Sequence, residues 1–142
     1  MTIKTRDFGE IEIDLKDVVT FINPIFGFEG YREFVFLHHQ EINPCFIWMQ
    51  SVQEPMLCFV LTNPWDVVSD YRVTLTENDI KTLGEGEYLY WALTVFRDPY
   101  YDSTINLKCP VVVNTKTGKA LQAIVEEAYS IKHPLISQKE DA

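Results

Sequence analysis

The sequence predicts an all-β fold: a compact, antiparallel, barrel-like single domain of about nine short strands with one short helix near residues 77–83. Three observations support this prediction. The chain has 142 residues, which suits one domain. Its apolar residues follow strand spacing almost throughout, and turn-forming residues separate the apolar runs. We expect the domain to cover residues 1–137, with residues 138–142 forming a flexible tail.

The expected strands are short runs rich in β-branched and aromatic residues. Residues 8–15 alternate between apolar and polar side chains, as a strand with one buried face does. Residues 45–50 and 56–62 do not alternate cleanly, so we expect a central hairpin that is covered on both faces. The remaining strands are expected at residues 17–22, 33–37, 87–96, 106–114 and 119–125.

One segment carries the signals of a helix. Thr76 can cap the first turn, Asp79 follows three residues later, and Gly84 provides a stop. We therefore expect a helix over Glu77–Leu83. Pro134 argues against a long helix in the C-terminal segment, because proline breaks a helix interior.

The chain is strongly acidic, with 12 Lys and Arg against 21 Asp and Glu for a net charge of −9. The excess lies in residues 1–100, which carry 7 basic and 16 acidic side chains, whereas residues 101–142 carry 5 of each. Such a surface repels phosphate backbones and anionic lipids, so we expect no direct nucleic-acid or membrane binding. It suits a basic protein partner, although solubility alone also explains the charge.

We expect a soluble protein of the cytoplasm. The apolar run Met56–Leu61 is far shorter than the ~20 residues that span a bilayer, and no secretory signal is recognisable. The three cysteines, Cys45, Cys58 and Cys109, form no CxxC pair and lie in apolar runs. This pattern indicates buried free thiols in a reducing compartment.

No pattern in the sequence points to catalysis, a metal or a cofactor. His38 and His39 are adjacent, and adjacent residues of a strand point to opposite faces, so they do not suit one metal ion. Ser51 lacks the Gly-x-Ser-x-Gly motif of a hydrolase nucleophile. Residues 84–86 are too few and too acidic for a phosphate-binding loop. The sequence therefore predicts a binding protein and not an enzyme.

Several aromatic residues fall in or after turns. Phe26 and Phe28 lie in a segment rich in turn residues, and Tyr100 and Tyr101 follow Asp98-Pro99. Most aromatic residues of a β-barrel pack in its core, but those in turns are harder for the sheet to bury. We therefore predict an apolar contact surface from these aromatic residues. The partner-binding candidates are Phe26, Phe28, Glu29, Tyr100 and Tyr101.

The ordered motifs of the chain resemble those of the flagellar assembly factor FliW family. The first half carries Pro24-Ile-Phe-Gly-Phe-Glu29, Phe46-Ile-Trp-Met-Gln-Ser51 and Asn63-Pro64. The second half carries Asn106-Leu-Lys-Cys-Pro-Val-Val-Val-Asn114, Gly118…Gln122-Ala-Ile124 and His133-Pro-Leu135. The likeness runs from about Phe8 to Leu135. It departs before Gly27, where family members commonly have Gly-Leu-Pro, and at Cys109, where alanine is usual.

The resemblance implies a cytoplasmic, non-enzymatic regulator with a β-barrel-like fold. Proteins of this family bind the translational repressor CsrA, a basic RNA-binding protein, and stop it from silencing flagellin mRNA. They also bind flagellin, so that accumulated flagellin captures the factor and frees CsrA. We expect a monomer when free, acidic side chains that steer CsrA, and aromatic candidates that seat an amphipathic helix of flagellin. A barrel that holds a small ligand and an unrecognised hydrolase are the alternatives.

Overall fold

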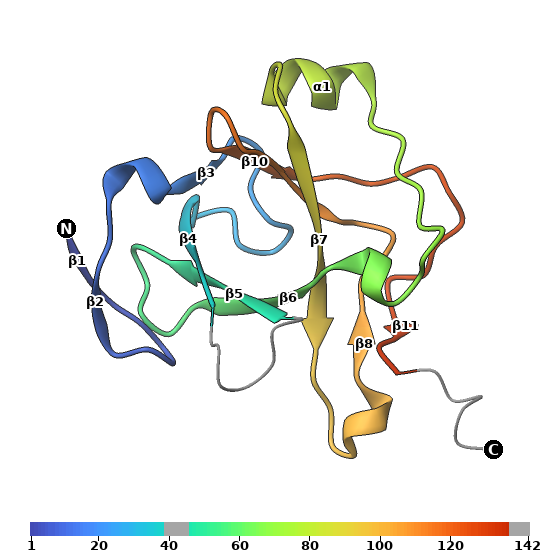
Figure 1. Cartoon of the computed structure of the whole chain (residues 1–142), viewed down its shortest axis with the longest axis horizontal. Helices are drawn as coiled ribbons and strands as arrows, with labels where there is room; N and C mark the ends of the chain where they lie inside the picture. Colours follow the sequence, from blue (N-terminus) through green and yellow to red (C-terminus); the bar gives the residue numbers. More distant parts are fainter. Residues whose placement is uncertain (39–45, 137–142) are drawn as a thin grey trace.

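The computed structural model describes residues 1–38 and 46–136 (Figure 1). Within them, seven strands close a barrel, and one short α-helix, α1 (Glu77–Leu83), lies above one end of it. The order around the barrel is β3 (Val19–Phe21), β4 (Glu33–Leu37), β5 (Phe46–Ser51), β6 (Cys58–Thr62), β7 (Tyr88–Val95), β9 (Val111–Asn114) and β10 (Lys119–Gln122), which returns to β3. The predicted all-β, barrel-like fold with one short helix is confirmed.

The remaining elements extend the barrel. β8 (Thr104–Ile105) and β11 (His133–Pro134) continue the sheet beside the lower half of β7, and β1 (Thr2–Lys4) and β2 (Glu10–Glu12) form a separate hairpin (Figure 1). Three 3-10 turns lie between these elements in the described part of the chain, and their bounds are η1 (Leu15–Asp17), η2 (Pro64–Asp66) and η3 (Tyr100–Asp102).

One pair of neighbouring strands in the barrel departs from the predicted antiparallel arrangement. β3 and β10 run parallel, with Lys119 opposite Thr20 and Ala120 opposite Phe21, whereas the other neighbouring pairs of the barrel are antiparallel. A closed ring with an odd number of strands must contain at least one parallel pair. If every neighbour reversed direction, the first and last strands of seven would point the same way, so one parallel pair has to close the barrel.

The centre of the barrel is filled with side chains. Phe21, Phe34, Met49 and Leu61 are fully buried there, and Phe21 meets Phe34 edge-on with ring centroids 5.4 Å apart. All six residues of β5 are buried, because its inner residues join this cluster while its outer residues pack under other segments. The predicted central hairpin with two covered faces is therefore confirmed.

Helix α1 starts and ends where its sequence signals predicted. The Thr76 hydroxyl accepts a hydrogen bond from the Asp79 N–H at 3.0 Å, the Asp79 carboxylate accepts one from the Thr76 N–H, and Gly84 ends the helix at a φ of 79°. The buried amide of Asn114 then holds the following loop by donating to the Leu83 and Glu85 carbonyls. No helix in the described residues has the length and apolar character to cross a membrane.

Several strand boundaries differ from the prediction. The expected strand 106–114 is wrong in its first half, because the Asn106 side chain accepts a hydrogen bond from the Cys109 N–H at 2.9 Å and turns the chain. The expected strand 8–15 shortens to β2, because Asp14 caps η1. The expected strand 17–22 shortens to β3. β1, β8 and β11 were not predicted, and the expected tail, 138–142, lies outside the described residues.

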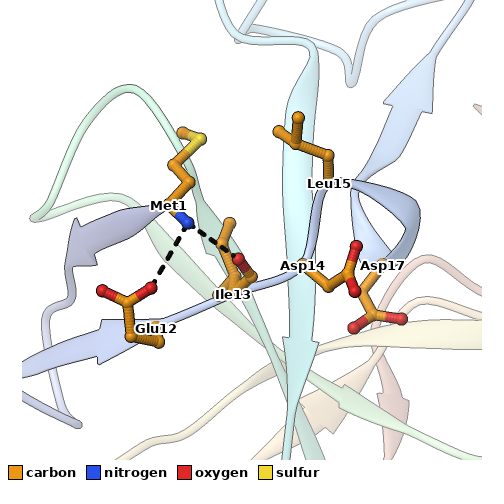
Figure 2. Close-up of a pocket in the computed structure, with 6 residues that line it drawn as sticks. All are labelled: Met1, Glu12, Ile13, Asp14, Leu15 and Asp17. Carbon is orange, nitrogen blue, oxygen red and sulfur yellow. Dashed lines mark hydrogen bonds and ion pairs between the residues drawn. The ribbon is translucent and has the colours of Figure 1, made fainter.

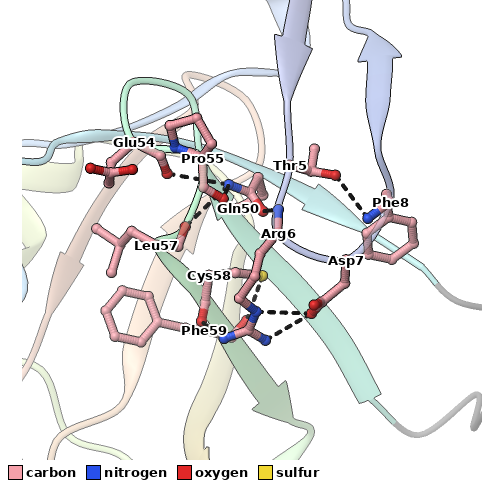
Figure 3. A network of polar contacts seen from close by, with 10 residues as sticks. All are labelled: Thr5, Arg6, Asp7, Phe8, Gln50, Glu54, Pro55, Leu57, Cys58 and Phe59. Carbon is pink, nitrogen blue, oxygen red and sulfur yellow. Dashed lines mark hydrogen bonds and ion pairs between the residues drawn. The ribbon is translucent and has the colours of Figure 1, made fainter.

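The β1–β2 hairpin is fastened to the outer face of β5 and β6 (Figure 3). The buried Gln50 side chain accepts a hydrogen bond from the Arg6 N–H at 3.0 Å and donates to the Pro55 carbonyl at 3.0 Å. The Arg6 guanidinium donates to the Cys58 carbonyl, and the Phe8 ring meets Trp48 edge-on at 5.9 Å. An isolated hairpin has only marginal stability in water, so these contacts with β5 and β6 explain why the β1–β2 hairpin is ordered.

Candidate functional site

The connection between β7 and β8 carries two of the predicted partner-binding residues. Tyr100 and Tyr101 lie in η3 and expose 51% and 54% of their surface. The backbone beneath them is fixed, because the Arg97 N–H donates to the hydroxyl of buried Ser103 at 2.9 Å and the Ser103 N–H donates to the Tyr100 carbonyl. The two tyrosines therefore stand on an ordered turn, as a binding surface requires.

Sequence reasoning missed a third ring at this place. Phe96 exposes 45% of its surface and stacks on Tyr100, with ring centroids 6.3 Å apart and planes at 20°. Its other side meets the buried ring of Phe46 edge-on at 5.3 Å. We call Phe96, Tyr100 and Tyr101 the η3 patch. The available signal is that Phe96 is the last apolar residue before Asp98-Pro99, but it also ends the expected strand 87–96, and a strand residue is expected to pack in the sheet.

The other candidates lie in the loop between β3 and β4, away from the η3 patch (Figure 1). Phe26 is 53% exposed, and its N–H donates to the Gln122 side chain at 3.1 Å. Phe28 is half-buried and packs edge-on against Phe59, with ring centroids 5.0 Å apart. The Glu29 carboxylate is exposed and accepts a hydrogen bond from the Gly27 N–H. The five candidates thus divide between two places, and Phe28 belongs in part to the core.

Neither a metal-binding cluster nor an activated cysteine nucleophile is found among the described residues. No three His, Cys, Asp or Glu side chains of residues 1–38 and 46–136 gather closely enough to hold a metal ion. Burial raises the pKa of the Cys58 thiol to about 11, so it stays protonated near neutral pH. Cys109 is half-buried, and burial likewise raises its pKa. Cys45 and His39, both considered from the sequence, lie outside the described residues.

The comparison with protein families is decisive for what this chain is. A family model described as FliW protein matches residues 2–135. The chain belongs to the FliW family. The resemblance noted in the sequence is therefore confirmed, and the match covers every described strand and the helix.

Individual relatives are similar in sequence to this chain over nearly their whole length. The flagellar assembly factor FliW of Exiguobacterium sp. is 37% identical over 138 residues, covering 95% of this chain and 94% of that protein. The flagellar assembly factor FliW of Syntrophotalea carbinolica is 37% identical over 137 residues, covering 94% and 96%. A crystal structure of the flagellar assembly factor FliW superposes with a TM-score of 0.90 at 34% identity and covers 98% of this chain and 99% of that one.

Proposed function

We propose that this protein is a flagellar assembly factor that acts in the cytoplasm by binding other proteins: it antagonises CsrA and it binds flagellin. The observation that carries the proposal is the FliW match over residues 2–135, together with the crystal structure that superposes on nearly the whole chain. The centre of the barrel is filled with side chains, so we place the contacts with partner proteins on the outer surface.

Charge supports CsrA as the first partner. The net charge is −9, and the acidic excess falls in residues 1–100. Many of these carboxylates lie on the surface, and examples are Asp66, Asp70, Glu77, Glu85 and Glu87. An RNA-binding protein presents cationic side chains, so a negative surface speeds its encounter with this protein.

Antagonism by binding sets an affinity that the complex must reach. A stoichiometric antagonist works when its dissociation constant lies at or below the cellular concentrations, about 1 μM or tighter, which is about −8 kcal/mol. Exchange between CsrA and flagellin further requires that binding of one disfavours the other, through a shared surface or a conformational coupling.

The η3 patch is the surface we assign to flagellin. Tyr100 and Phe96 are about half exposed, stack on each other and rest on a buried ring, so an apolar helix face can cover them with little loss of side-chain freedom. The loop that carries Phe26 offers one exposed ring, because Phe28 packs on Phe59.

Tyr100→Ala should weaken flagellin binding about ten-fold, because truncating a central aromatic anchor costs 1 kcal/mol or more. Isothermal titration with purified flagellin measures the change. Phe26→Ala is the matched control, since it removes an equally exposed ring from the other location. If Phe26→Ala weakens flagellin binding and Tyr100→Ala leaves it unchanged, the assignment to the η3 patch is wrong.

A further inference from the structure

One stretch of the barrel wall has an open strand edge. β4 pairs with β5 as far as Leu37, opposite Trp48, but its pairing with β3 ends at Phe34, opposite Val19. Residues 35–37 therefore have no strand partner on the β3 side within the described chain. An edge of this kind is a template for one more strand.

The main-chain groups of Phe36 point to this open side. The Glu33 carbonyl accepts a hydrogen bond from the Val52 N–H, so Glu33 faces β5, and the Arg32 carbonyl accepts one from the Phe21 N–H, so Arg32 faces β3. Main-chain groups alternate in direction along an antiparallel strand, which turns those of Phe36 toward the same side as those of Arg32. Phe36 therefore presents one donor and one acceptor to a chain that lies beside it.

A cavity of about 330 Å³ lies against this edge. Its β4 wall is apolar, with Val35, Phe36 and Leu37, and its opposite wall is the segment 12–17, which contributes Ile13 and three carboxylates. The carboxylates are those of Glu12, Asp14 and Asp17. Figure 2 shows segment 12–17 beside β4, with the Asp14 and Asp17 carboxylates directed away from Leu15.

We propose that this groove binds a short, extended, basic segment of a protein partner, which adds to the edge of β4. The Phe36 main chain would hydrogen-bond the segment, its Lys or Arg side chains would meet the carboxylates, and the side chains between them would pack on β4. The acidic lining fits a cationic segment better than an anionic one, and the open edge of β4 fits an extended segment better than a helical one. Glu12 and Asp14 also pair with the Met1 amino group and Lys16, so Asp17 is the carboxylate most available to the segment. The inference rests on the proposed function for its partner, CsrA.

Asp17 is the residue to change. Glu12 pairs with the Met1 amino group, and Asp14 caps η1 by accepting from the Lys16 N–H at 3.0 Å, so their replacement would disturb the N-terminal segment. Asp17→Lys should weaken CsrA binding about five-fold by isothermal titration, because it puts a cation in the groove. Asp70→Lys makes the same charge change at an exposed residue outside the groove and should weaken CsrA binding by less than about two-fold.

The two variants separate local contact from long-range steering. Equal losses in Asp17→Lys and Asp70→Lys would overturn the groove while leaving CsrA antagonism intact. If the wild-type protein does not bind CsrA, the proposed function is contradicted. The groove can then still be tested with a second probe.

That probe is a blocked Lys-Val-Lys-Val-Lys peptide, followed by amide hydrogen exchange in the native protein. At millimolar peptide the Phe36 N–H should exchange several-fold more slowly, and a Glu-Val-Glu-Val-Glu peptide should leave its rate unchanged. An unchanged Phe36 rate with the basic peptide, or equal protection by the two peptides, would overturn the inference.

Discussion

Asn114→Ala should lower the free energy of unfolding by about 3 kcal/mol. The Asn114 amide nitrogen donates to the Leu83 carbonyl at 2.8 Å and the Glu85 carbonyl at 3.0 Å, and its oxygen accepts from the Lys116 N–H at 2.9 Å. One fully buried side chain thus joins the end of α1 to the β9–β10 turn, and alanine leaves all three main-chain groups without this partner. Urea denaturation followed by tryptophan fluorescence measures the loss.

Asn78→Ala is the control for this change, because Asn78 is an exposed amide within α1. Its effect should stay within about 0.5 kcal/mol. Loss of the same size in both variants, or an Asn114→Ala protein as stable as the wild type, would show that the amide does not hold these segments together. Gly86 supports the arrangement, because a Cβ there would collide with the Asn114 side-chain oxygen.

Phe34→Ala should cost about 4 kcal/mol of unfolding free energy, the second large effect. The Phe34 ring is fully buried in the barrel, edge-on to Phe21 at 5.4 Å and beside Phe59 at 6.0 Å. Its removal leaves a cavity that the surrounding strands close only in part, so lost packing adds to lost burial. The midpoint of urea denaturation should fall with little change in slope.

Phe26→Ala removes the same atoms from an exposed position and should change stability by less than about 0.5 kcal/mol. A Phe34→Ala protein that loses no more stability than Phe26→Ala would mean that the barrel centre is not closely packed. That result would also strengthen the alternative of a barrel that holds a small ligand.

The sequence predicted those elements whose signals are local. Thr76, Asp79 and Gly84 lie within nine residues of one another and make α1 through their own hydrogen bonds, so the helix could be located without the rest of the chain. The β5–β6 hairpin likewise showed itself by two adjacent apolar runs. The helix is therefore found with the predicted bounds, and the two strands of the central hairpin are found with bounds that differ by one or two residues.

Elements that depend on distant partners could not be predicted in this way. β8 and β11 have two residues each and exist because Ile105 pairs with His133 and Thr104 with Pro134. The parallel pair arises from closure of the ring, which no local pattern records. At the candidate site, turn signals located Tyr100 and Tyr101, but whether an aromatic ring such as Phe28 is covered depends on Phe59, far away in the sequence.

The affinity of CsrA for this protein, measured by isothermal titration from low to high salt, tests the central claim most directly. We expect a dissociation constant of about 1 μM or tighter at low salt, and weaker binding as salt screens the acidic surface. Failure to bind at tens of micromolar, a threshold of about −6 kcal/mol, would contradict antagonism by binding. An affinity that stays constant across the salt series would contradict the electrostatic part of the account.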